Sequence, residues 1–120
     1  MDILVVEDNK QSREALLSMF QRMGLRAHGV LSSNEALQEL DRRVPRIILS
    51  DWDLNESLSG IDIAAYALDR CSECVVMFYT GNSVCQLKQQ TTHLRIHRYF
   101  KKPVSLQELR SECWAVFNSR

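Results

Sequence analysis

The sequence predicts an α/β domain in which five strands alternate with five helices and form one doubly wound parallel sheet. Short apolar runs alternate with amphipathic stretches along the chain, an order that is typical of strand–helix units in a parallel sheet. A length of 120 residues suits one hydrophobic core. Residues 1–120 are therefore expected to form a single domain.

Five segments are predicted to be strands. They cover residues 3–6, 26–30, 47–50, 75–79 and 97–100. Most of them are rich in β-branched, other aliphatic or aromatic side chains, which suit buried strands. Because helical crossovers between parallel strands are right-handed, the helices are expected on both faces of the sheet.

Capping residues mark the starts of three of the five predicted helices. Asn9 suits the N-cap of the first helix, which Gly24 ends. Ser32 and Ser105 each stand three residues before a glutamate, the spacing of a capping box, and the last helix is expected to run almost to the end of the chain. The remaining two helices are predicted from about 60 to 69 and from about 83 to 92. The second of these ends in two threonines, which weaken helix propensity.

Composition excludes several classes of protein. Fifteen basic and fifteen acidic residues cancel, so the domain lacks the positive field used in binding nucleic acid. No apolar run approaches the length of a membrane span, and no signal peptide is visible, so a cytoplasmic location is expected. The C-x-x-C pair Cys71 and Cys74 has no second half to complete a zinc site and is interpreted as structural.

Acidic, hydroxyl and basic side chains follow the predicted strands. In a parallel sheet the functional crevice lies beyond the carboxyl ends of the strands. The residues at these ends are Glu7 and Asp8 after the first strand, Asp51 and Asp53 after the third, Thr80 after the fourth, and Lys101 or Lys102 after the fifth. They are expected to meet in one site.

The predicted site has the parts that phosphoryl transfer requires. Clustered carboxylates repel one another unless a cation intervenes, and ligands that are all oxygen favour Mg²⁺ or a similar hard ion such as Mn²⁺. A metal, a lysine and a hydroxyl donor stabilise a transferring phosphoryl group. A carboxylate can also attack phosphorus and carry the group as an acyl phosphate. Asp51 is the predicted nucleophile.

Four separated segments resemble the receiver domains of two-component response regulators, in the order of that family. They are Glu7-Asp8 after Ile-Leu-Val-Val, the Ile-Ile-Leu-Ser-Asp strand that ends at Asp51, the Thr80-Gly81 step, and Tyr99-Phe100-Lys101-Lys102-Pro103. The resemblance covers essentially the whole chain. It implies a flavodoxin-like sheet with the strand order 2-1-3-4-5.

The resemblance implies a role for each matched residue. Asp51 would accept a phosphoryl group from the phosphohistidine of a histidine kinase or a histidine phosphotransfer protein. Asp8 and Asp51 would bind Mg²⁺ directly, Glu7 would act largely through water, and the backbone carbonyl of Asp53 would complete the protein ligands. Lys102 would pair with the phosphoryl oxygens. The domain would thus assist its own phosphorylation and dephosphorylation without being an enzyme for separate substrates.

The resemblance also implies a conformational switch. Thr80 would bond to the new phosphoryl group and Tyr99 would turn inward, changing the surface of the fourth helix, fifth strand and last helix. That surface would act on an output domain or protein, or form a dimer. Lys101 is expected to face away from the site, because successive side chains of a strand alternate. The peptide bond before Pro103 is expected to be cis.

The loop after the acceptor departs from the family pattern. Residues 52–60 form a loop that is one residue longer than usual, and no proline follows Leu54. Asp53 adds a carboxylate near the path of an attacking water, where it would alter the lifetime of the phosphorylated state in a direction that the sequence does not give.

Two alternative functions compete with the receiver. Asp51-Trp52-Asp53 also fits the D-x-D start of phosphatases similar to haloacid dehalogenases, but in those enzymes the motif follows the first strand and an acidic pair comes later. The second alternative is a receiver-like docking module that is not phosphorylated, which the altered loop favours. The presence of Thr80 and Lys102 argues against it.

Overall fold

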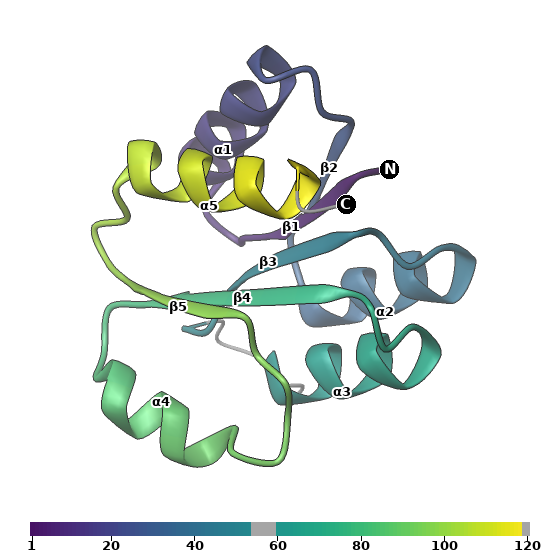
Figure 1. Cartoon of the computed structure of the whole chain (residues 1–120), viewed down its shortest axis with the longest axis vertical. Helices are drawn as coiled ribbons and strands as arrows, with labels where there is room; N and C mark the ends of the chain where they lie inside the picture. The colour runs from purple at the N-terminus through teal and green to yellow at the C-terminus, as the bar shows by residue number, and fades with distance from the viewer. Residues whose placement is uncertain (54–59, 119–120) are drawn as a thin grey trace.

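The computed structural model describes residues 1–53 and 60–118 and contains one parallel sheet with the strand order β2-β1-β3-β4-β5 (Figure 1). This order and the flavodoxin-like architecture confirm the prediction. The strands are β1 (Ile3–Val6), β2 (Ala27–Val30), β3 (Ile47–Asp51), β4 (Val75–Thr80) and β5 (Arg98–Lys101). Every neighbouring pair is parallel, so all the strands end at the same edge of the sheet.

Helices cover both faces of the sheet. Figure 1 shows α1 (Lys10–Arg22) and α5 (Leu106–Asn118) on one side, with α2 (Ser33–Arg42), α3 (Gly60–Arg70) and α4 (Val84–Gln90) on the other. No helix in the described part of the chain is both long and apolar enough to cross a membrane.

Two hydrophobic cores lie on opposite faces of the sheet, because successive residues of a strand face opposite ways. Ile3 and Val5 belong to the core beneath α1 and α5, whereas Leu4 and Val6 belong to the other core. All four are fully buried, and full burial of such a side chain contributes roughly 1.5–3 kcal/mol. The central strand β1 is thereby fixed, and with it the position of the acidic pair that follows.

The predicted caps are confirmed. Asn9 Oδ1 accepts from the Ser12 backbone N–H at 2.9 Å. The hydroxyls of Ser32 and Ser105 accept from the backbone N–H three residues later, at 3.1 and 3.2 Å. Gly24 follows the first helix with φ +83°, a conformation that glycine adopts readily. These caps satisfy backbone N–H groups that the first turns of α1, α2 and α5 leave without a partner in the helix.

Strand ends differ from the prediction by one residue. The second and fifth strands start one residue later than expected, and the third, fourth and fifth end one residue later, at Asp51, Thr80 and Lys101. Asp51 pairs with Tyr79, and Thr80 pairs with Lys101. The backbone ladder thus extends to these polar residues, so the site begins on rigid strand rather than in loop.

The fourth helix is shorter than predicted. Ser83 is its N-cap and Thr91 its C-cap, so it covers only Val84–Gln90 of the expected range 83–92. The Thr91 hydroxyl donates to the Leu87 carbonyl at 2.9 Å, a bond that competes with continued helix. The expected features of the loop after Asp51, its added length and the missing proline, fall on 54–59, outside the described residues.

Candidate functional site

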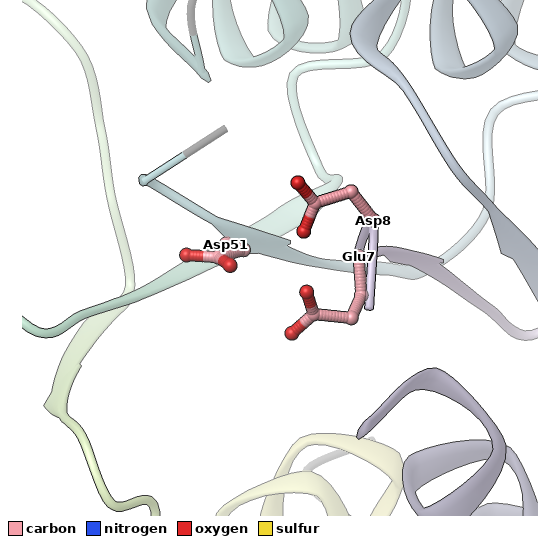
Figure 2. Close-up of side chains that lie close together, drawn as sticks. All are labelled: Glu7, Asp8 and Asp51. Atoms are coloured by element: carbon pink, nitrogen blue, oxygen red, sulfur yellow. The ribbon is translucent and has the colours of Figure 1, made fainter. Parts of the chain in front are cut away.

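Three carboxylates lie together at the edge of the sheet where β1 and β3 end (Figure 2). Glu7, Asp8 and Asp51 each offer an oxygen, and these oxygens lie within 4.8 Å of one another. The strand register explains the grouping: Val6 pairs with Ser50, so the next residues, Glu7 and Asp51, come side by side. This set of oxygens suits a hard divalent cation.

Asp51 is buried and held by donors from two directions. It is 3% exposed, and its Oδ1 accepts from the Asp53 backbone N–H at 2.9 Å. Lys102 Nζ lies 3.0 Å from both carboxylate oxygens. Burial lowers the pKa of Lys102, but the hydrogen bond and charge of Asp51, followed by those of Asp53, raise it above its usual value. Lys102 is therefore a fixed positive charge beside Asp51 at neutral pH.

Glu7 is buried, and both of its carboxylate oxygens accept hydrogen bonds. It is 3% exposed. The Tyr79 hydroxyl donates to its Oε1 at 2.6 Å, and the Asn9 backbone N–H donates to its Oε2 at 3.1 Å. Burial raises the pKa of Glu7, and these two hydrogen bonds counter only part of that effect. Burial and Glu7 together raise the pKa of Tyr79, which stays a neutral donor.

Asp53 uses its side chain in a way that the sequence did not indicate. Oδ1 accepts from the Thr80 hydroxyl at 2.7 Å and from Asn82 Nδ2 at 3.0 Å. Oδ2 accepts from the Gly81 backbone N–H at 2.7 Å and lies 3.2 Å from Lys102 Nζ. Burial opposes ionisation, but these donors, led by Gly81, lower the pKa of Asp53 to about 2. Its carboxylate is therefore an anion enclosed by donors.

The two lysines after β5 have different environments. Lys101 Nζ donates to the backbone carbonyls of Gly81 and Asn82 at 2.8 and 2.7 Å, so it faces away from the carboxylates, as predicted. Lys102 reaches the carboxylates instead. The peptide bond between Lys102 and Pro103 is cis.

Tyr99 lies on the side of the sheet that α4 covers. It is half-buried, and its hydroxyl is 2.5 Å from Thr91 Oγ1. Its ring centroid is 6.5 Å from that of Phe78, and Lys88 Nζ lies 5.7 Å from the ring. Tyr99 thus connects β5 with the C-terminal end of the short helix α4.

Sequence reasoning missed two contributors to the site. Tyr79 was treated only as the end of an apolar strand, although a hydroxyl next to Thr80 was a usable signal. Asn82 carries no signal, because nothing in a turn sequence shows where an amide side chain points. Both donate to carboxylates of the site.

A family model for the response regulator receiver domain matches residues 3–113. The chain belongs to this family. Receiver domains act in two-component signalling with a histidine kinase or phosphotransfer partner, and they bind Mg²⁺ at an acidic pocket. In this receiver domain, the cluster of Glu7, Asp8 and Asp51 could hold such an ion.

Solved structures of receiver domains share the fold of this chain. A receiver domain protein from Clostridium thermocellum has a TM-score of 0.88 at 21% identity, with 98% of this chain and 94% of that chain covered. A CheY-like receiver domain protein from Methanospirillum hungatei JF-1 has a TM-score of 0.86 at 15% identity, with 99% of this chain and 98% of that chain covered. The BeF3-activated DrrB receiver domain has a TM-score of 0.85 at 20% identity, with 97% of this chain and 96% of that chain covered. No curated protein matches the chain.

A pocket of about 510 Å³ opens beside the acids of this receiver domain. Glu7, Asp51 and Lys102 line its polar side, and Leu16 of α1 and Leu109 of α5 line its apolar side. Through this pocket, a small charged group and its waters can reach Asp51 from the side of α1 and α5.

Proposed function

We propose that residues 1–120 form one receiver domain that accepts a phosphoryl group on Asp51 from the phosphohistidine of a kinase or phosphotransfer protein. The observation that supports this best is the position of Asp51, with the acids Glu7 and Asp8 within 4.8 Å and Lys102 at 3.0 Å. Cations beside a nucleophilic carboxylate reduce its repulsion of an anionic phosphoryl donor and stabilise the transferring oxygens. Lysine supplies one of them.

The acidic cluster is the proposed site of the second cation, Mg²⁺ or Mn²⁺. Asp8 is exposed and would bind the ion directly together with Asp51. Both oxygens of Glu7 already accept protein hydrogen bonds, which supports contact through water, and the Asp53 carbonyl would be the remaining protein ligand. Bound Mg²⁺ would offset the charge of the carboxylates and of the transferring oxygens.

The proposed reaction is an in-line displacement at phosphorus. An Asp51 oxygen forms the new O–P bond as the N–P bond to the donor histidine breaks, and the electron pair of that bond leaves with the imidazole. Lys102 Nζ stays within reach of the new phosphoryl oxygens because it already contacts Asp51. Hydrolysis of the acyl phosphate by water restores the carboxylate.

The proposed readout is a change in the surface formed by α4, β5 and α5. Thr80 ends β4 directly before the segment that leads into α4, and Tyr99 bonds to Thr91 at the C-cap of that helix. A phosphoryl group that binds Thr80 would therefore bias the position of α4 at its N-terminal end, and Tyr99 would bias it at its C-terminal end. An output domain or protein, or a second copy of the chain, would bind this surface.

Incubation with Mg²⁺ and phosphoramidate, followed by intact mass measurement, tests the proposal. The wild type should gain one phosphoryl group, and both chelation of the metal and the Asp51→Asn substitution should prevent it. Steady release of phosphate from a small phosphate ester would instead identify a phosphatase. Absence of both reactions would identify a docking module.

A further inference from the structure

The Asp53 carboxylate fills a small anion-binding site between β4 and Lys102. Thr80, Gly81, Asn82 and Lys102 supply the donors, at 2.7 to 3.2 Å. Two donors reach each oxygen, and a carboxylate offers about four lone-pair positions. The four donors therefore match the lone-pair positions of the anion, and the side chain remains 22% exposed.

One of these donors, Lys102, also contacts Asp51. Lys102 Nζ lies 3.0 Å from Asp51 Oδ1 and 3.2 Å from Asp53 Oδ2, so it joins the two carboxylates. The Asp53 backbone N–H also donates to Asp51 Oδ1 at 2.9 Å. On the proposed function, a phosphoryl group on Asp51 would use Lys102 and Thr80, both of which now bind the Asp53 carboxylate.

Thr80 and Gly81 each have one proton to donate, so the Asp53 carboxylate and a phosphoryl group would compete for it. Thr80 has one hydroxyl proton, and its oxygen accepts from the Asn82 backbone N–H at 3.0 Å, so the proton is given to Asp53. The Gly81 N–H is likewise a single proton. Neither group can donate fully to a phosphoryl oxygen while it donates to Asp53.

We propose, on the basis of the function proposed above, that Asp53 is an internal competitor of the phosphoryl group. Its carboxylate holds Thr80, Gly81 and Lys102 in the unphosphorylated domain and must release them when Asp51 is phosphorylated. Two consequences follow. Phosphoryl gain is slowed, because bonds must break and a nearby negative charge repels the donor. The segment before α4 is already ordered around an anion, so phosphorylation reorganises it less.

The experiment compares Asp53→Ala and Asp53→Asn with the wild type and with Asp69→Asn. Asp69 is exposed near the C-terminal end of α3, at the edge of the sheet opposite the site. Its substitution therefore controls for the change in net charge. The first readout is the rate of phosphoramidate labelling in Mg²⁺, followed by intact mass. The second is the affinity for beryllofluoride in Mg²⁺, followed by Trp52 fluorescence.

Both Asp53 variants should label faster and bind beryllofluoride more tightly, by about tenfold, the factor that corresponds to 1.4 kcal/mol of released competing bonds. Asp69→Asn should behave as the wild type. Asp53→Asn keeps the shape of the side chain, so it tests competition even if Asp53→Ala folds poorly.

The possible results separate the two proposals. Labelling of the variants but not of the wild type supports competition most strongly. Equal or slower labelling in both Asp53 variants overturns the competition while leaving Asp51 as acceptor. No labelling and no beryllofluoride binding in any of the proteins overturns the proposed function, and the competition with it.

Discussion

The Tyr79 hydroxyl donates a 2.6 Å hydrogen bond to Glu7, although β3 lies between the strands of these two residues. Lys102 Nζ lies 5.5 Å from the centre of the same aromatic ring. One side chain of β4 therefore contacts both an acid of the cluster and the lysine beside Asp51. Tyr79 thus helps to position Glu7 through its hydroxyl and Lys102 through its ring.

Tyr79→Phe should lower the free energy of unfolding by about 1.5–3 kcal/mol, the range for a hydrogen bond to a charged group. The ring stays, so packing is preserved and Glu7 loses a buried donor. Urea denaturation without metal measures the effect. Tyr66→Phe is the matched control, because Tyr66 bonds to Asp41 at the surface, and it should change stability far less than Tyr79→Phe. Equal losses in the two variants would show that the bond to Glu7 contributes nothing special.

Asp8→Asn should have opposite effects with and without metal. Without metal it should stabilise the fold by up to about 1 kcal/mol, because it relieves repulsion among the three clustered carboxylates. With Mg²⁺ the wild type should gain thermal stability as the ion binds the native state, and the variant should gain much less. Thermal denaturation with and without Mg²⁺ measures both signs. An equal Mg²⁺ response would remove Asp8 from the metal site.

The ion pairs of Glu112 should make stability depend on pH in the acid range. Burial raises the pKa of Glu112, but hydrogen bonds from His97 and Arg98 outweigh it and hold the pKa below its usual value. This contribution is complete above the unfolded pKa of about 4.3 and is lost as the pH falls through the lower native pKa.

Glu112→Gln should therefore destabilise the domain at neutral pH by less than about 1 kcal/mol, as is usual for partly exposed pairs. The stability curves of variant and wild type should converge as the pH falls below about 4. Denaturant titrations across this range test the prediction, and parallel curves would contradict it.

Thr91 and Tyr99 should be energetically coupled. Their hydroxyls are 2.5 Å apart, and Thr91 is 1% exposed. In a double-mutant cycle of Thr91→Val and Tyr99→Phe, the coupling energy should be about 0.5–3 kcal/mol. The cycle separates this bond from the one that Thr91 makes with the Leu87 carbonyl. Additive losses would mean that Tyr99 is not tied to α4 through its hydroxyl.

The sequence predicted the fold and the meeting of the strand-end residues because both depend on periodicity. Parallel strands bring their carboxyl ends to one edge, so reading the residues after each apolar run located Asp51, Thr80 and Lys102. Strand ends were misplaced by one residue because apolar patterns do not show how far the backbone ladder continues into polar residues.

The partners of Asp53 could not be predicted for a different reason. Asp53 lies in a turn after β3, where neither the strand period nor the helix period fixes the direction of a side chain. Its neighbours Gly81 and Asn82 lie in another loop, 28 and 29 residues away along the chain. Only the folded arrangement brings these groups together.

Borohydride reduction of the labelled protein, followed by peptide mapping, tests the central claim most directly. Reduction converts an aspartyl phosphate to homoserine, so the changed residue marks the phosphate acceptor. After incubation with Mg²⁺ and phosphoramidate, we predict homoserine at Asp51 alone and none in Asp51→Asn. Homoserine at Asp8 or Asp53 in the wild type, or no homoserine at all, would contradict the account.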